Sequence, residues 1–76
     1  MRELVSLLAR GLVREPGRVR VHEHDDAGHR LLELSVAPAD RGRVIGRGGR
    51  TAAALRTLVG SLARRRGGTC TLEILD

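Results

Sequence analysis

Gly42-Arg43-Val44-Ile45-Gly46-Arg47-Gly48-Gly49-Arg50 is the stretch that decides the fold, because a glycine-rich turn there follows an aliphatic pair and precedes a helical pattern. Gly46 and Gly49 bracket two residues, and without side chains at these positions the backbone can turn tightly and approach a ligand closely. From Thr51 to Leu62 apolar residues recur at helical spacing, so amides near Gly49 and Arg50 are expected at a helix N-terminus, free to attract anions. The stretch therefore predicts a phosphate-binding turn between two helices.

Two other kinds of phosphate loop do not fit these residues. A P-loop needs a lysine after its last glycine, and the chain contains no lysine. A dinucleotide-binding fingerprint needs a third glycine where Thr51 stands, if Gly46 and Gly48 are the first two, and a hydrophobic strand before the loop. Pro38-Ala39-Asp40 indicates instead that a short helix begins there and runs to about Ile45. A nucleotide-binding enzyme fragment is kept as a third hypothesis about function.

The length of the chain, 76 residues, leaves room for one domain covering residues 1–76 and for one small core. There is no uninterrupted apolar stretch of about 20 residues, and arginines and glycines break the N-terminal apolar pattern. We therefore expect a soluble cytoplasmic protein that makes no membrane contact. Cys70 is the only cysteine, so an internal disulfide is impossible, and its alternating neighbours predict a small buried hydrophobe.

The charge of the chain is unevenly distributed. The net charge is +5, and eight arginines lie between Arg41 and Arg66 with no acidic residue among them. All nine acids lie outside this window, so the positive potential is concentrated on the glycine turn and the helix after it. Guanidinium groups match the geometry of phosphate oxygens. The distribution predicts a polyanionic partner.

The first half of the chain reads as one helix and two strands. Arg2 to Glu15 shows an amphipathic helical pattern that ends at Pro16-Gly17. The apolar face of this helix is made of Leu4, Val5, Leu8, Leu12 and Val13. Arg18 to His24 and Arg30 to Val36 alternate as half-buried strands, with Asp25-Asp26-Ala27-Gly28 as the turn between them. The residues that face inward from these strands are predicted to be Val19, Val21, Leu32, Leu34 and Val36, with Leu31 on the exposed face.

The second half reads as two helices and a last strand. After the short helix and the glycine turn, the long helix is predicted to face inward through Ala52, Leu55, Leu58, Val59 and Leu62. Gly67-Gly68 ends it, and Thr69 to Leu75 forms a strand with Cys70, Leu72 and Ile74 inward. The predicted fold is therefore α+β, in the order α-β-β-α-α-β, with helices packed on one face of a three-stranded sheet.

A helix, a four-residue glycine turn and a second helix resemble the GXXG loop of KH domains, which clamps the backbone of about four nucleotides. The order of elements is similar to that of a type II KH domain. Among KH proteins, Glu3-Leu4-Val5, Leu34-Ser35-Val36-Ala37-Pro38, the stretch from Gly42 to Ala52 and Leu72-Glu73-Ile74 resemble the small free-standing bacterial kind, the KhpA family. The resemblance covers essentially the whole chain. One departure is Gly48 in the second variable position of the loop, which leaves Arg47 as its only charged side chain.

The resemblance implies a protein that binds single-stranded RNA and acts as an RNA chaperone or post-transcriptional regulator, and no enzyme, cofactor or small-molecule substrate. It also implies a homodimer, or a heterodimer with a larger KH-containing, Jag-type protein, and a link to cell elongation, cell shape, cell wall biogenesis and peptidoglycan homeostasis. Bases would lie along an aliphatic groove beside the loop, so the absence of Phe, Tyr and Trp is no obstacle. The predicted RNA-binding residues are Arg43, Val44, Ile45, Gly46, Arg47, Gly48, Gly49, Arg50 and Arg56.

Three alternatives remain beside this interpretation. The loop could serve assembly, in a KH-fold module that binds a protein partner rather than RNA. Arg64, Arg65 and Arg66 fit cations that stabilise a helix C-terminus as well as an RNA contact. Arg56 fits a solvated helix face as well as an RNA contact. The three histidines, His22, His24 and His29, lack a further correctly placed ligand, so we expect no metal site, and no nucleophile with a base suggests catalysis.

Overall fold

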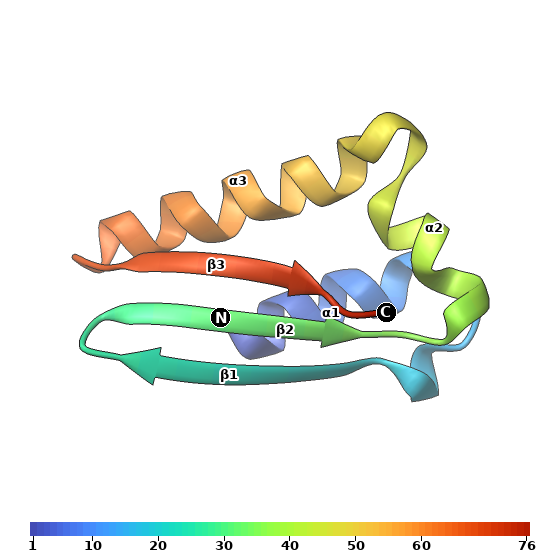
Figure 1. The fold of residues 1–76 in the computed structure, drawn as a ribbon, viewed down its shortest axis with the longest axis horizontal. Helices are drawn as coiled ribbons and strands as arrows, with labels where there is room; N and C mark the ends of the chain where they lie inside the picture. Colours follow the sequence, from blue (N-terminus) through green and yellow to red (C-terminus); the bar gives the residue numbers. More distant parts are fainter.

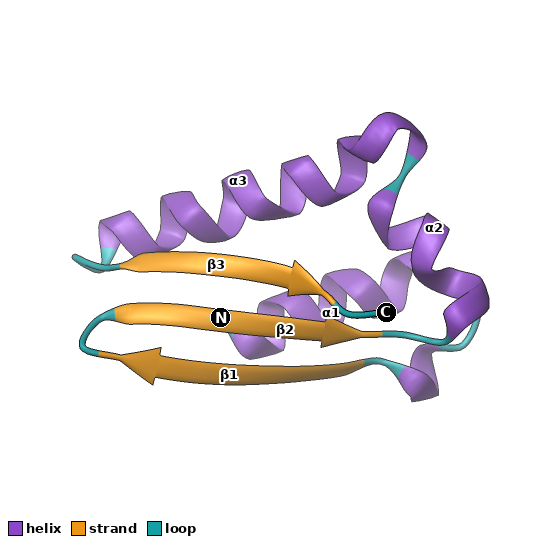
Figure 2. Ribbon diagram, in the orientation of Figure 1, coloured by secondary structure: helices purple, strands orange, loops and turns teal.

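The computed structural model describes all residues from 1 to 76, and it contains three helices and three strands in the predicted order (Figures 1 and 2). Three single 3₁₀ turns join them, at Pro16–Arg18, Pro38–Asp40 and Arg47–Gly49. The six elements are α1 (Arg2–Leu12), β1 (Arg20–Asp26), β2 (His29–Ser35), α2 (Arg41–Ile45), α3 (Arg50–Arg65) and β3 (Thr69–Ile74). None of the helices combines the length and the apolar character needed to cross a bilayer.

The three strands form one sheet in the order β1-β2-β3. Strands β1 and β2 are antiparallel, whereas β2 and β3 are parallel. A parallel pair needs a crossover between its strands, and here α2, the glycine turn and α3 supply it. The crossover places the glycine turn at one end of the molecule, opposite the β1–β2 hairpin (Figure 1).

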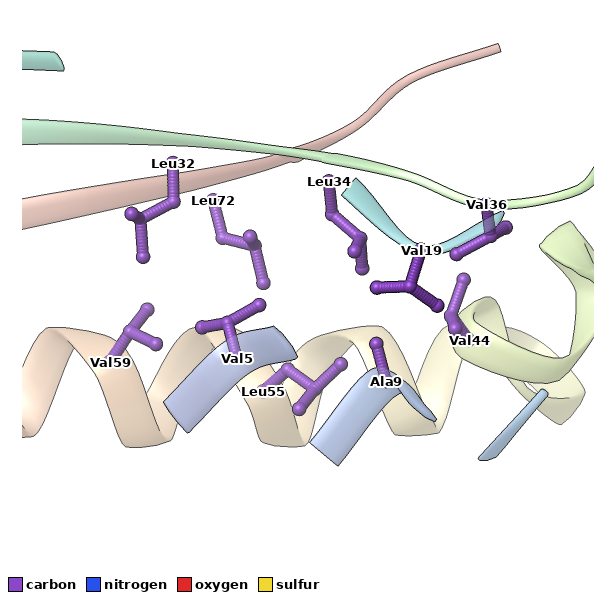
Figure 3. Packing of buried hydrophobic residues seen from close by; sticks show 10 residues of the cluster. All are labelled: Val5, Ala9, Val19, Leu32, Leu34, Val36, Val44, Leu55, Val59 and Leu72. Carbon is purple, nitrogen blue, oxygen red and sulfur yellow. The ribbon is translucent and has the colours of Figure 1, made fainter. Parts of the chain in front are cut away.

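The core lies between the sheet and the two longer helices, as Figure 3 shows. Helix α1 packs against β1 and α3 against β3, so the helices cover one face of the sheet, as the sequence predicted. Leu32 and Leu34 of the central strand are fully buried. Burial of a leucine side chain stabilises the fold by about 1.5–3 kcal/mol. The cluster consists of Val5, Ala9, Val19, Leu32, Leu34, Val36, Val44, Leu55, Val59 and Leu72.

The β1–β2 hairpin turns through two residues instead of the predicted four. Asp26 pairs with His29, and Ala27 and Gly28 between them have φ angles of 51° and 89°. Two positive φ angles mark the turn whose twist matches that of the flanking strands, so the strands remain paired up to the turn. For this reason β1 runs two residues further than predicted, and it begins two residues later, after the 3₁₀ turn at Pro16–Arg18.

Two leucines that the sequence placed in the core are exposed. Leu12 of α1 keeps 38% and Leu58 of α3 39% of its surface accessible. Ala9 and Ala63 are buried in the positions that face the sheet directly, because small side chains let a helix approach closely where leucine would hold it away. The inward assignment of Leu12 and Leu58 was therefore wrong.

The glycine pair at the end of α3 closes the helix as predicted. The N–H groups of Gly67 and Gly68 donate to the carbonyls of Arg64 and Ala63, at 3.0 and 2.9 Å. Gly67 has a φ of 79°. These two bonds and the left-handed residue make a Schellman motif, which satisfies carbonyls that the helix end leaves free.

Candidate nucleic-acid interface

The glycine turn between α2 and α3 is built from three residues with positive φ. Gly46 ends α2 with φ 78° and ψ 169°, a conformation that only glycine adopts readily. Gly48 and Gly49 follow in the left-handed region, with φ angles of 63° and 78°. The chain thereby changes direction between α2 and α3 within four residues, as the sequence predicted, and presents the turn at a corner of the molecule (Figure 1).

Gly46 is also the point where the backbone of the turn comes closest to α3. A Cβ atom at this position would lie against Thr51, 2.8 Å from its Cβ atom and 2.9 Å from its backbone nitrogen. Gly48 and Gly49 have open space where a Cβ atom would stand. The first glycine of the GXXG pattern is therefore required by packing and by backbone conformation, whereas the other two are required by conformation alone.

Two amides of the turn are used within the turn itself, which corrects the expectation that they are free. The N–H of Gly49 donates to the carbonyl of Gly46 at 3.0 Å. The N–H of Arg50 donates to the carbonyl of Arg47. A 3₁₀ turn thus tightens the start of α3 and satisfies these donors. Attraction of anions at this corner consequently depends on side chains more than on the amides of Gly49 and Arg50.

Three exposed arginines surround the turn. Arg43 of α2 lies 3.6 Å from a carboxylate oxygen of Asp40, measured from Nε. Arg47 and Arg50 make no ion pair and no side-chain hydrogen bond, so their guanidinium groups keep all their donors available. Side chains of this kind bind phosphate oxygens through parallel hydrogen bonds. The turn therefore carries two uncompensated positive charges at an exposed corner.

The aliphatic pair before the turn divides between core and surface. Val44 is fully buried, so its side chain supports α2 from within and is not available for the contact with RNA that the sequence predicted. Ile45 is half-buried. No cavity of the structure is lined by Ile45, so any surface for bases beside the turn is shallow.

Arginines from both crossover helices donate to backbone carbonyls in β3 and just after it. Arg56 of α3 donates through Nε to the carbonyl of Leu72 at 3.1 Å. Arg41 of α2 donates through Nε to the carbonyl of Leu75 at 3.0 Å and pairs with the carboxylate of Asp76 at 2.8 Å. Arg56 is thus partly engaged by the fold, yet the residue stays exposed. Arg64, Arg65 and Arg66 are exposed at the opposite end of α3.

Asp40 is a residue whose role the sequence analysis missed. Its side chain is the only buried charged one, and it accepts the N–H groups of Arg14 and Glu15, both at 3.1 Å. These amides follow the last turn of α1, so the carboxylate at the start of α2 fastens the end of α1. In the sequence, an acid two residues after Pro38 indicated only a favourable interaction with the helix dipole. It did not indicate a contact with the distant end of α1.

Two of the histidines contact neighbouring side chains, and the only cysteine is a free thiol. His24 contacts Glu33 at 2.8 Å between Nε2 and Oε1, and His29 contacts the hydroxyl of Thr69 at 2.6 Å. No group of three or more potential ligands is arranged to hold a metal ion. Cys70 is half-buried. Partial burial, reinforced by the negative charge of Glu23, raises the pKa of the Cys70 thiol, which keeps it protonated.

The order α-β-β-α-α-β, with a GXXG turn between two helices that cross from one parallel strand to the next, defines a KH domain of type II. A family model described as the KH domain of KhpA/KhpB matches residues 2–74. The chain belongs to this KhpA/KhpB family, as the resemblance of its motifs implied. The family is one of binding proteins rather than enzymes.

Individual relatives are similar over most or all of their length. The protein named RNA-binding protein KhpA of Halalkalibacterium halodurans is 51% identical over 77 residues, which covers all of both chains. The protein of the same name from Treponema pallidum is 45% identical over 97% of this chain and 92% of its own. That of Mycobacterium tuberculosis is 49% identical over 83% of this chain and 79% of its own. No solved structure gives a significant match.

Proposed function

We propose that residues 1–76 act as a single KH module that binds single-stranded RNA through the glycine turn and the surface beside it. The observation that carries this proposal is the pair of free guanidinium groups, Arg47 and Arg50, on an exposed turn whose positive φ angles its glycines make possible. Arg43 adds a third positive charge beside them. Relatives similar over the whole chain are named RNA-binding proteins, which supports the same conclusion.

In this proposal the arginines hold the sugar-phosphate backbone, and the bases lie on the shallow surface between Ile45 and the outer edge of β3. With about four phosphates neutralised, the logarithm of the binding constant should fall against the logarithm of salt concentration with a slope of roughly −3. Gly46 keeps the backbone of the turn close to α3, so the RNA strand can approach without meeting a side chain.

The test replaces Arg47 and Gly48 together by aspartate. Aspartate tolerates the left-handed conformation of Gly48 better than most residues and finds open space there, so the variant should fold, as far-ultraviolet circular dichroism can verify. We expect its affinity for short single-stranded RNA to fall by about tenfold or more, because one phosphate contact is lost and two negative charges are added.

A matched control carries Gly17→Asp and Arg18→Asp, which change the same residue types at an exposed turn away from the loop. This control should lose much less affinity. If the folded loop variant binds short RNA as well as the control does, the proposed function is wrong. A loop variant that keeps its RNA but loses a protein partner would favour the KH-fold interaction module instead.

We also propose that the module pairs with a second copy of itself. An apolar groove of about 310 Å³ lies between α1 and α3 and is lined by Leu8, Leu12, Thr51, Ala54, Leu55 and Leu58. Leu12 and Leu58 are exposed and line the groove together with the small residue Ala54, so one patch offers both a hollow and apolar side chains to fill it in a second copy. A twofold contact needs such self-complementarity. Pairing would raise the affinity for RNA, because two linked modules bind one strand together.

Leu58→Glu tests this pairing by sedimentation velocity. The charge would enter the groove at the contact, so we expect the variant to sediment as a monomer where the unmodified chain is a dimer. Leu7→Glu is the control, because Leu7 is 62% exposed and lies outside the groove. An unmodified chain that is monomeric at high concentration contradicts self-pairing. The larger Jag-type KH protein is then the partner to test with the same two variants.

The family resemblance extends the proposal to the cell. We propose that the module acts in the cytoplasm as an RNA chaperone and contributes to cell elongation and peptidoglycan homeostasis. The support for these roles is the resemblance alone. Depletion of the protein, followed by measurement of cell length, examines them independently of binding in solution.

A further inference from the structure

A second cationic surface lies at the other edge of the sheet, between α1 and β1. A groove of about 250 Å³, here called the α1–β1 groove, is lined by Arg2, Glu3, Ser6, Arg10, Val19, Arg20 and Val21. Because β1 and β3 are the two outer strands of the sheet, this groove is separated from the α3–β3 side by β2 and the core. It shares no residue with the glycine turn.

The sequence of α1 produces this surface directly. Arg2, Ser6 and Arg10 are spaced four residues apart, so they form one stripe along successive turns of the helix, about 12 Å from end to end. The neighbours of Arg10 at three and four residues are Ser6, Leu7, Val13 and Arg14. None of them is acidic, so no ion pair within the helix neutralises Arg10.

The contacts of the three arginines leave their charges largely uncompensated. The side chain of Arg10 makes no hydrogen bond and no ion pair. Arg20 donates through Nη1 to the carbonyls of Gly17 and Val19, both at 2.8 Å, which fixes the side chain without neutralising it. Arg2 approaches Glu3 at 3.8 Å, and both side chains are mostly exposed, so the pair contributes little.

Negative charge gathers at one end of the groove only. Glu3 lines it, and Glu23 lies just beyond, where its carboxylate accepts the backbone N–H of Arg2 at 3.2 Å. The end formed by Arg10 and Arg20 has no acidic lining residue. Three arginines against one glutamate leave the lining with an excess of two positive charges.

We propose that the α1–β1 groove binds the phosphate backbone of a second RNA segment, so that one module holds two segments at opposite edges of its sheet. The lining favours phosphate over an acidic peptide. Its only apolar residues are Val19, which is buried, and Val21, which is half-buried, so there is no apolar pocket for a peptide side chain. Arginine forks and the hydroxyl of Ser6 are donors that suit phosphate oxygens.

This inference rests on the proposed function of the glycine turn for the first RNA segment, and it adds a bridging activity. The variant that tests it carries Arg2→Gln and Arg10→Gln, and Arg20 stays because it bonds the backbone of its own turn. The matched control carries Arg14→Gln and Arg18→Gln, which remove the same formal charge at two residues that do not line the groove.

Three measurements are compared for the two variants. For an oligonucleotide of about four nucleotides, which the turn alone can hold, both variants should bind within about twofold of the unmodified chain, since distant charges are screened. For a long single strand, the groove variant should flatten the salt slope by about 1.4, the value for two lost phosphate contacts. Energy transfer between two differently labelled RNAs should report bridging by the unmodified chain and the control, and be lost in the groove variant.

Each other outcome overturns the inference. Equal effects of the groove and control variants on the long strand mean that only total charge matters. Loss of short-oligonucleotide binding in the groove variant means that there is a single site. Binding of a polyglutamate peptide that depends on Arg2 and Arg10, with long RNA unaffected, assigns the groove to an acidic protein. A separate result would contradict the proposed function of the glycine turn. That result is unchanged binding of short RNA by the Arg47→Asp/Gly48→Asp variant.

Discussion

Replacement of Gly46 by alanine is expected to lower the free energy of unfolding by about 3 kcal/mol. Two costs add at this position. The φ and ψ angles of 78° and 169° belong to a region that is essentially restricted to glycine. The new methyl group would also collide with the side chain and backbone nitrogen of Thr51 at the start of α3. A domain of this size has roughly 4–11 kcal/mol of stability in total, so the loss is severe.

Urea denaturation followed by circular dichroism measures this loss, and Gly48→Ala is the control. Gly48 has a positive φ of 63° but open space around it, so alanine there should cost only about 1–2 kcal/mol. Equal losses at Gly46 and Gly48 would show that the contact with Thr51 is unimportant. RNA affinity, measured below the unfolding transition, should fall more for Gly46→Ala because the whole turn must shift.

Replacement of Asp40 by alanine is expected to cost about 3 kcal/mol as well, for a different reason. The buried carboxylate accepts two backbone N–H groups, from Arg14 and Glu15. A hydrogen bond to a charged group contributes about 1.5–3 kcal/mol, and amides left without a partner cost more. The substitution also releases α2 from the end of α1, so the glycine turn loses its support and RNA affinity should fall in parallel.

Two further variants make this expectation specific. Asp40→Asn keeps the shape and one acceptor oxygen, so it should lose about half as much stability as Asp40→Ala. Asp76→Ala removes an acid that is almost fully exposed and pairs with Arg41, so its unfolding transition should hardly move. If Asp40→Ala behaves like Asp76→Ala in urea denaturation, the carboxylate does not hold the two elements together.

Much of this architecture could be predicted from local patterns. Three local patterns predicted their elements correctly, because each depends only on neighbouring residues. They are the alternation around Leu32 and Leu34, the helical repeat after the glycine turn and the glycine pair after Arg66. The prediction was wrong where a contact with a residue distant in the sequence determines where an element ends. The helical pattern of α1 was extended to Glu15, yet the helix ends at Leu12, because the amides of Arg14 and Glu15 bond Asp40 instead of continuing the helix.

The candidate site shows the same division. The residue types of the turn and the acid-free arginine window were readable from the sequence, and the structure places Arg43, Arg47 and Arg50 around one corner. The burial of individual side chains and the hydrogen bonding of individual amides could not be predicted from the sequence. Whether Val44 is buried, and whether the N–H of Gly49 finds an acceptor, depends on how α2 packs and how the 3₁₀ turn closes.

The parallel pairing of β2 with β3 has a consequence for the order in which the chain folds. His29 and Thr69 are register partners 40 positions apart, so a long segment must close before they meet, and such distant pairing is slow to form. The hairpin of β1 and β2 needs no such closure and is expected first. The glycine turn lies inside the closing segment, so the event that completes the sheet also builds the corner proposed to bind RNA, and an incompletely folded chain should compete poorly for RNA.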